Sequence, residues 1–240
     1  MKRAKVHFAF LFVAAIVIAG YLWLKTSYPS GSWHYRMTVI VETPEGIKAG
    51  STIREISFHT ELRILPQQGG TYYAVSKGEA VAIDLGDKGK VFAIMRGGWG
   101  GVDYGHRIAL DALRLDIGQN ANTKAVLKPE QYPTFIWFRD IRDPTSAVNA
   151  FHVEFYDTRD QKQNFLGRKS RIENRFEELF GNGVRIKEVT VEATDAPVTW
   201  GVSEVLPSFG VETRFSEWRK SLRFDDPLSF DRTDFIRGEQ

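Results

Sequence analysis

Four titratable side chains are the strongest candidates for catalysis in this sequence of 240 residues. Asp103 and His106 are three residues apart, so a helix over this stretch would place them together as an acid–base pair. His152 and Glu154 are two residues apart, so a strand would point both side chains to one face of a sheet. The structural alternatives are a capped surface helix for the first pair and solvent-facing sheet positions for the second.

Three further side chains are candidates for ligand binding. Trp99 lies in the run Gly97–Gly101, which interrupts the strand pattern, while Arg139 and Arg142 alternate with aspartates directly after the apolar run 135–138. An exposed aromatic beside arginines is typical of a binding surface. A turn that docks one aromatic, and an Arg–Asp network that fixes a loop, would explain the same residues without a ligand.

Other catalytic classes have weak support. The glycine-rich run does not match the spacing of a phosphate-binding loop, and no Ser lies in a Gly-x-Ser-x-Gly motif. The chain has no Cys, which excludes disulfides, thiolate metal sites and a Cys nucleophile. His59 and Glu61 repeat the spacing of His152 and Glu154, but a metal site would need two strands to bring both pairs together. We predict no metal and no cofactor.

Residues 6–24 form an uncharged run that is long enough for a helix to cross a bilayer. Three basic residues precede it and only Lys25 follows closely, so the positive-inside bias predicts a cytoplasmic N-terminus and a periplasmic or other extracytoplasmic domain. We predict an uncleaved single-pass anchor in the inner (cytoplasmic) membrane; a signal peptide cleaved after Val17-Ile18-Ala19 is the alternative. The predicted anchor residues are Phe8, Phe10, Leu11, Phe12, Val13, Ile16, Val17, Ile18, Leu22, Trp23 and Leu24.

The distribution of charge along the chain indicates which kinds of partner the protein can bind. Removing Lys2, Arg3, Lys5 and Lys25 from the 32 basic residues leaves 28 basic against 30 acidic residues over 26–240. This near-neutral region lacks the electrostatic footprint of a general nucleic-acid binder. We predict contact with the membrane through the N-terminal helix, a protein or envelope partner, and no nucleic acid.

Hydrophobic periodicity predicts an α+β fold in which the transmembrane helix precedes a mainly antiparallel β domain with a few short helices. Residues 33–43 and 51–61 alternate as an antiparallel hairpin. The clearest helix pattern covers 171–180, where Ser170 and Glu173 form a capping box. Further strands are predicted at 72–75, 80–85, 91–95, 134–138, 151–156, 184–193 and 198–206.

The same pattern predicts four segments along the chain. Residues 1–25 are the cytoplasmic stub and transmembrane helix, 26–32 a linker, 33–206 the exported β-rich domain, and 207–240 a partly docked C-terminal tail whose last ten residues fray.

Several blocks resemble a known family. They are FRDIRDPTSAV (138–148) and LFGNGVRIKEVTVEATDAPVTWGVSEVLPSF (179–209), together with Trp-His-Tyr-Arg and Val-Glu-Thr-Pro-Glu-Gly near the start of the domain. They are similar to an uncharacterised family of proteobacterial single-pass membrane-anchored proteins with an exported domain. That family has no established activity, so the resemblance implies only an anchored, exported architecture.

The sequence therefore predicts a membrane-anchored envelope protein that acts as a non-enzymatic binding or interaction module. The alternative is a hydrolase or metal-assisted enzyme at the membrane surface that uses Asp103, His106, His152 and Glu154.

Overall fold

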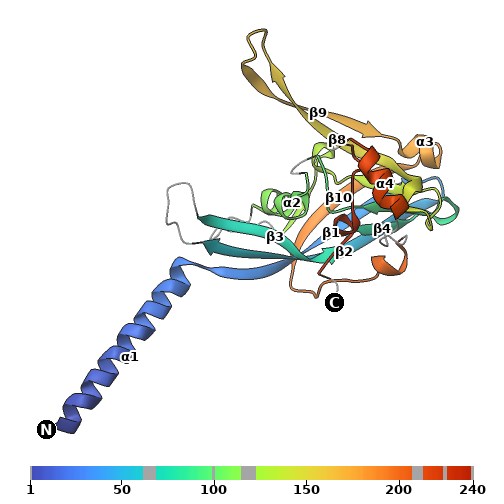
Figure 1. The fold of residues 1–240 in the computed structure, drawn as a ribbon. Coiled ribbons are helices and arrows are strands. Elements are labelled where there is room, and N and C mark those ends of the chain that lie inside the picture. Colours follow the sequence, from blue (N-terminus) through green and yellow to red (C-terminus); the bar gives the residue numbers. More distant parts are fainter. Residues whose placement is uncertain are drawn as a thin grey trace. The chain divides into compact units, whose positions relative to one another are not determined.

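The computed structural model shows a chain dominated by antiparallel β-sheets with a few helices (Figure 1). The predicted β-rich character is confirmed. The described residues are 2–61, 69–98, 101–114, 123–206, 213–223 and 226–238, with the backbone alone over 2–11 and 213–214.

The chain divides into two compact units. Unit 1 comprises residues 1–32 and 57–73, and unit 2 comprises residues 33–56 and 74–240. Helix α1 spans Lys2–Ser27 and strand β1 begins at Ser30, so most of the stretch predicted as a linker, 26–32, lies inside these two elements.

Two sheets contain the described strands. The six-stranded sheet has the order β11-β3-β2-β1-β10-β6, and the five-stranded sheet has the order β4-β5-β7-β8-β9. The strands are β1 (Ser30–Thr43), β2 (Gly46–Glu61), β3 (Gly70–Glu79), β4 (Val81–Asp84), β5 (Lys90–Ala93), β6 (Lys124–Val126), β7 (Phe135–Phe138), β8 (Ala147–Arg159), β9 (Phe165–Asn174), β10 (Arg185–Thr194) and β11 (Ile236–Arg237).

The alternation seen in the sequence sets the faces of the six-stranded sheet. In β1, every second residue from Tyr35 to Val41 is fully buried, which buries one face of the strand as a period of two requires. Strand β10 pairs antiparallel with β1, with Met37 opposite Val191 and Val39 opposite Val189. Cross-strand apolar pairs of this kind stabilise the sheet.

The helices are short apart from α1. They are α2 (Tyr104–Leu113), α3 (Phe176–Phe180) and α4 (Thr213–Ser221), with 3-10 turns η1 (Gly86–Lys88), η2 (Pro129–Gln131), η3 (Pro144–Ser146), η4 (Val202–Glu204) and η5 (Arg232–Asp234). Asp143 accepts a hydrogen bond from the backbone N–H of Thr145, so it caps η3, which begins at Pro144.

An aromatic core joins the five-stranded sheet to the C-terminal segment. Phe92 and Phe138 pack edge-on, 5.9 Å between ring centroids, and Phe235 packs on both rings. Phe230 and Phe235 are fully buried, and Ile236 in β11 pairs with Glu79 in β3. The prediction that the last ten residues fray is therefore wrong up to Arg237, because Phe235 and Ile236 complete this core. Residues 239–240 lie outside the described residues.

The predicted helix over 171–180 is wrong over its first half. Residues 165–174 form β9, whose register with β8 places Val153 opposite Ile172 and Phe155 opposite Ser170. Helix α3 covers only Phe176–Phe180. Pairing with a neighbouring strand overrides the local Ser-x-x-Glu pattern, because the ladder satisfies the same backbone groups that a helix would.

The predicted strand over 198–206 is absent from the described structure, which has η4 there instead. Glu79 Oε2 accepts hydrogen bonds from the backbone N–H groups of Gly201 and Val202, both at 2.8 Å. This buried carboxylate turns the chain away from an extended path.

The predicted transmembrane helix requires correction. Within the described residues, no helix is long and apolar enough to cross a membrane. The part of the fold class that rested on this helix, and the inner-membrane localisation, are both withdrawn.

The structure describes the side chains of some of the predicted anchor residues and not of others. Phe8, Phe10 and Leu11 lie outside the residues whose side chains are described. The described ones are 52–64% exposed: Phe12, Val13, Ile16, Val17, Ile18, Leu22, Trp23 and Leu24.

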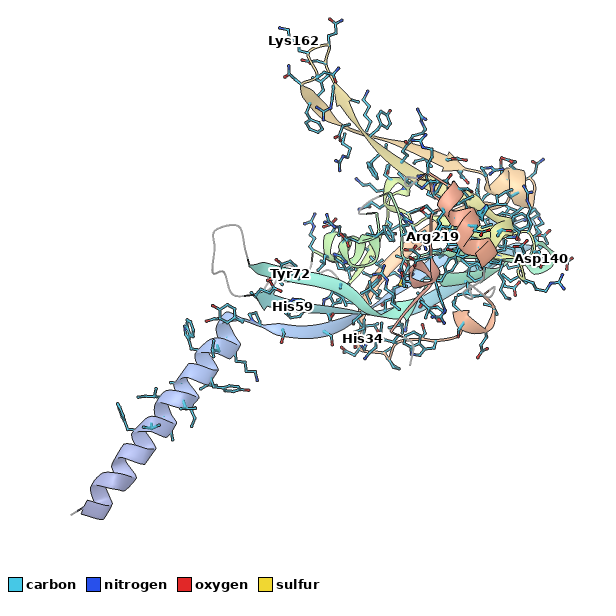
Figure 2. All side chains as sticks on the ribbon, viewed as in Figure 1. His34, His59, Tyr72, Asp140, Lys162 and Arg219 are labelled. Atoms are coloured by element: carbon cyan, nitrogen blue, oxygen red, sulfur yellow. The ribbon has the colours of Figure 1, made fainter. Side chains whose placement is uncertain are left out.

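Strands β8 and β9 form a long antiparallel ribbon that extends away from the rest of unit 2 (Figure 1). We call residues 147–153 with 172–174 the base and residues 154–171 the arm. In β8, six of the seven base residues are buried, whereas every arm residue is exposed or half-buried. The β8 part of the base belongs to the core, whereas residues 172–174 of β9 are exposed. The arm extends into solvent, with Lys162 at its tip (Figure 2).

Candidate functional site

The four predicted catalytic residues lie on two elements. Asp103 precedes α2 and contacts Arg107 at 3.7 Å across one helical turn, and His106 lies in the first turn. His152 and Glu154 lie on β8, where Glu154 contacts Arg171 of β9 at 3.8 Å. None of the hydrogen bonds or ion pairs described for these residues joins the α2 pair to the β8 pair.

Both histidines favour the neutral form. Burial lowers the pKa of His106, and the nearby Asp103 carboxylate opposes this effect. Burial also lowers the pKa of His152, against the opposing carboxylates of Glu173 and Glu154. Within the described residues, no group of three or more His, Asp or Glu is placed to hold a metal ion.

His59 and Glu61, the second pair considered for a metal site, lie in unit 1. Their side chains are 3.4 Å apart, and the His59 ring stacks on Tyr72 with centroids 5.5 Å apart (Figure 2). The Oγ1 atoms of Thr60 and Thr71 lie 2.9 Å apart and share a hydrogen bond in which either hydroxyl can be the donor. The imidazole is thus held by a carboxylate and an aromatic ring.

A polar network that the sequence did not predict lies on β1, β2 and β3 within unit 2. His34 Nε2 lies 3.4 Å from Glu55 Oε2, and Ser76 Oγ donates to Glu55 Oε1 at 2.7 Å. The Ser76 hydrogen bond is the main cause that lowers the pKa of Glu55. A hydrolytic triad needs the hydroxyl bonded to the imidazole. Here the carboxylate lies between them, so no base activates Ser76.

One buried cation also belongs to unit 2. Arg54 is fully buried; its Nε donates to the carbonyl of Glu79 at 2.9 Å and its Nη1 to the hydroxyl of Tyr35 at 3.2 Å. Nη2 has no hydrogen-bond partner among the described residues. None of the described cavities is lined by Arg54, so the guanidinium ties strands together inside the core.

The arginine cluster predicted as a binding candidate forms a fixed loop after β7. Arg142 donates two hydrogen bonds to Asp140, from Nε to Oδ1 at 3.1 Å and from Nη2 to Oδ2 at 3.2 Å, and this pairing lowers the pKa of Asp140. Ser146 Oγ donates to the carbonyl of Asp143 at 2.7 Å. The predicted structural network is present, and it holds the backbone that carries Arg139.

Arg139 and Arg142 also line a cavity of about 730 Å³ in unit 2. Three segments that are distant in sequence form it: the turn between β4 and β5, the end of β7 with its following loop, and the residues around η4. Its lining residues are Asp84, Gly86, Asp87, Lys88, Gly89, Lys90, Trp137, Phe138, Arg139, Ile141, Arg142, Glu204, Val205 and Leu206. We call this cavity the cleft.

Trp137 connects two walls of the cleft. Its indole Nε1 donates to the carbonyl of Lys88 at 3.0 Å, which fixes the β4–β5 turn against β7. Its ring meets Phe180 edge-on at 5.5 Å between centroids. Gly89 in this turn has φ +82°, a left-handed conformation that favours glycine, and the position that a Cβ would take lies 3.5 Å from the indole nitrogen. The cleft is therefore preformed by main-chain and aromatic packing.

The charged groups of the cleft differ in their partners. Lys90 forms an ion pair with Asp84, and Arg142 is paired with Asp140. Arg139 is exposed and has no ion pair among the described residues. Four basic and three acidic residues line the cleft, so the lining carries one excess positive charge. Lys88 also has no ion pair among the described residues, but it is half-buried, so Arg139 is the more exposed cation for a ligand.

The sequence identified part of the cleft only. Arg139 and Arg142 were predicted from their alternation with aspartates, whereas Trp99 lies outside the described residues. Sequence reasoning missed Lys88, Trp137 and Leu206. The glycine-flanked turn 86–89 was visible, but no local pattern indicated which strand it would meet.

Comparison of the chain with models of known protein families, with curated proteins and with solved structures found no match to any of them.

Proposed function

We propose that this chain is a non-enzymatic binding module whose ligand occupies the cleft. The observation that carries the proposal is a preformed cavity of about 730 Å³ lined by an indole, aliphatic side chains and the exposed cation Arg139, which has no ion-pair partner in the part of the chain that the structure describes. Ligand sites are typically about 300–1,000 Å³, mainly apolar, with a few polar groups that orient the ligand.

The lining favours binding over catalysis. It contains neither His nor Ser, and the loop hydroxyl of Ser146 is used in hydrogen bonds to the carbonyls of Asp140 and Asp143. Of its three acidic side chains, Asp84 is paired with Lys90, which lowers the Asp84 pKa and keeps that carboxylate ionised. General acid–base catalysis needs a group whose pKa lies near the working pH.

The apolar and charged parts of the lining indicate the ligand chemistry. Trp137, Ile141 and Leu206 offer an apolar surface, and Arg139 offers a guanidinium beside it. A planar guanidinium binds a carboxylate through two parallel hydrogen bonds. The ligand that fits is one with an apolar body and an acidic group.

A pair of matched probes tests this assignment. 1-Naphthylacetate and its cationic counterpart 1-naphthylmethylammonium are titrated into the full-length ¹⁵N-labelled protein, and the Trp137 indole N–H and the backbone of 137–142 are followed by NMR. The acetate should shift these signals and bind at least about 3-fold more tightly than the cation, because Arg139 supplies a charged hydrogen bond at a partly exposed site.

Two variants locate the acidic group. Arg139→Ala should weaken 1-naphthylacetate about 3- to 10-fold, whereas Arg142→Ala, whose guanidinium already binds Asp140, should change it by no more than about 2-fold. Equal affinity for the two probes, or shifts scattered over the chain without Trp137, would contradict the proposal.

A further inference from the structure

The arm of the β8–β9 ribbon exposes apolar side chains that no described core covers. Phe165 and Leu166 are 60% and 67% exposed. Tyr156 and Ile172 are also exposed along the same ribbon. An isolated two-stranded ribbon is marginally stable in water, so such a feature usually packs on something.

Strand β9 offers the free edge for that contact. It is the last strand of the five-stranded sheet and pairs with β8 on one side. The η2 turn approaches the ribbon at its base, where Tyr132 packs on Phe151 opposite Asn174. Along the arm, the unpaired backbone groups of an edge strand can therefore pair with another extended chain.

The side chains of β9 differ between its two faces. Lys169 and Arg171 share one face with Phe165 and Glu173. Leu166 and Ile172 share the other face with Arg168, whose guanidinium is already paired with Asp157 at 3.0 Å. Lys169 lies opposite Tyr156 and has no ion pair among the described residues. Arg171 contacts Glu154 at 3.8 Å, a weak pair with both side chains largely exposed.

This pattern decides what kind of strand fits beside β9. The segment FLGRKSRIEN holds three basic residues and one acidic residue. A second copy of β9, paired antiparallel with Lys169 opposite Arg171, would place like charges directly opposite each other, which is destabilising. An incoming strand that alternates acidic and apolar residues would instead face Lys169 and Arg171 with carboxylates, and Leu166 and Ile172 with apolar side chains.

We propose that the free edge of β9 binds an extended segment of a partner protein in which acidic and apolar residues alternate, by strand addition to the five-stranded sheet. The site is separate from the cleft: Asp140, beside the cleft, and Lys162, at the arm tip, lie at different ends of unit 2 (Figure 2).

Synthetic peptides test the proposal on the full-length protein. A fluorescein-labelled (Val-Glu)₅ peptide is compared with (Val-Lys)₅ by fluorescence anisotropy, and with a (Val-Glu)₅ peptide N-methylated at alternate residues, which cannot donate to the edge. The unmodified acidic peptide should bind at least about 10-fold more tightly than either control, because ladder hydrogen bonds and cross-strand charge pairs both contribute. Hydrogen exchange should slow at β9 amides on binding.

Matched charge reversals assign the contact to the strand. Lys169→Glu should weaken (Val-Glu)₅ about 3- to 10-fold, since a favourable cross-strand pair becomes a repulsive one. Lys162→Glu makes the same charge change at the arm tip, outside the ladder, and should change affinity by less than about 2-fold. Arg139→Ala should leave peptide binding unchanged, so a failed cleft and a failed edge are distinguishable.

Three outcomes would overturn the proposal. These are equal binding of the acidic and basic peptides, unchanged binding by the N-methylated peptide, and exchange protection that appears outside β9. A concentration-dependent dimer in sedimentation that Lys169→Glu abolishes would show that a second copy occupies the edge instead.

Discussion

The base and the arm of the β8–β9 ribbon belong to the same pair of antiparallel strands, yet their surroundings differ. At the base, Phe151 is 2% exposed and packs on Phe135 with ring centroids 5.8 Å apart. In the arm, Phe165 is 60% exposed. Backbone pairing alone therefore does not make a strand part of the core; burial of one face does, and burial supplies most of the stabilising free energy.

The same contrast separates the two proposed binding surfaces. The cleft is built where strands pack on the core, so its shape is fixed before a ligand arrives. The arm presents exposed side chains and a strand edge, but none of the described core packs against it. A partner would therefore have to reduce the conformational freedom of the arm on binding. A preformed site loses less conformational entropy on binding than a site that must be ordered.

The largest expected difference between base and arm concerns stability. Phe151→Ala should lower the free energy of unfolding by about 3–5 kcal/mol, because it removes a buried ring and leaves a cavity. Phe165→Ala makes the same change in the arm and should cost less than about 0.5 kcal/mol, as for an exposed surface position. Urea unfolding of both variants followed by circular dichroism measures the two values. Equal losses would show that the arm also packs on something in the free protein.

Hydrogen exchange should show a second difference within single strands. Amides of β8 at 148–153 should exchange through global unfolding, whereas ladder amides at 155–159 should exchange through local opening of the ribbon. We expect the arm amides to exchange at least about 100-fold faster, equivalent to about 2.7 kcal/mol of opening free energy. Uniform protection along β8 would remove the distinction between base and arm.

Single hydrogen bonds should also contribute differently in the two regions. Trp137→Phe removes the bond to the Lys88 carbonyl beneath the cleft and should destabilise the protein by about 1 kcal/mol. Thr158→Val removes the bond from Thr158 Oγ1 to Gly167 in the arm, where water can replace it, and should cost less than about 0.5 kcal/mol. Thermal unfolding of each variant against the wild type gives the comparison.

The smallest expected effects are on the pH dependence of stability. Burial raises the pKa of Glu79 above its ordinary 4.5 in the folded protein. Its protonated form is therefore favoured on folding, and the stability it contributes below pH 4.5 is lost as pH rises through the folded pKa. Glu79→Gln should make stability fall less between pH 4.5 and 7, as measured by urea unfolding at several pH values.

The stability of the arm should depend on pH in the opposite direction. Hydrogen bonds from Asn164 and backbone N–H groups lower the pKa of Asp160, below its ordinary 3.8. Its contribution is present above pH 3.8 and lost as pH falls through the folded pKa. Asp160→Asn should therefore reduce the acid sensitivity of the arm, seen as slower loss of arm amide protection below pH 4. A change of the same sign in both variants would refute this assignment.

The sequence predicted secondary structure correctly where a residue pattern repeats along a strand. It predicted wrongly where the assignment rested on a single local motif. The alternation in 33–43 and 51–61 predicted β1 and β2 because each successive side chain reports its face. The Ser170–Glu173 motif predicted a helix, but two residues of local pattern carry less free energy than nine cross-strand partners in β8. The apolar run 6–24 predicted a span that the described helix does not supply.

The sequence by itself determined which residues could alternate across a sheet, that thiol chemistry is excluded, and that Arg139 and Arg142 lie next to aspartates. Only the tertiary structure decided that Lys88, Trp137 and Leu206 meet to form the cleft and that β9 is the last strand of the five-stranded sheet among the described residues. Side-chain periodicity is local and can be read from neighbours in the chain. Strand order depends on contacts between distant segments, whose free energy belongs to the whole fold.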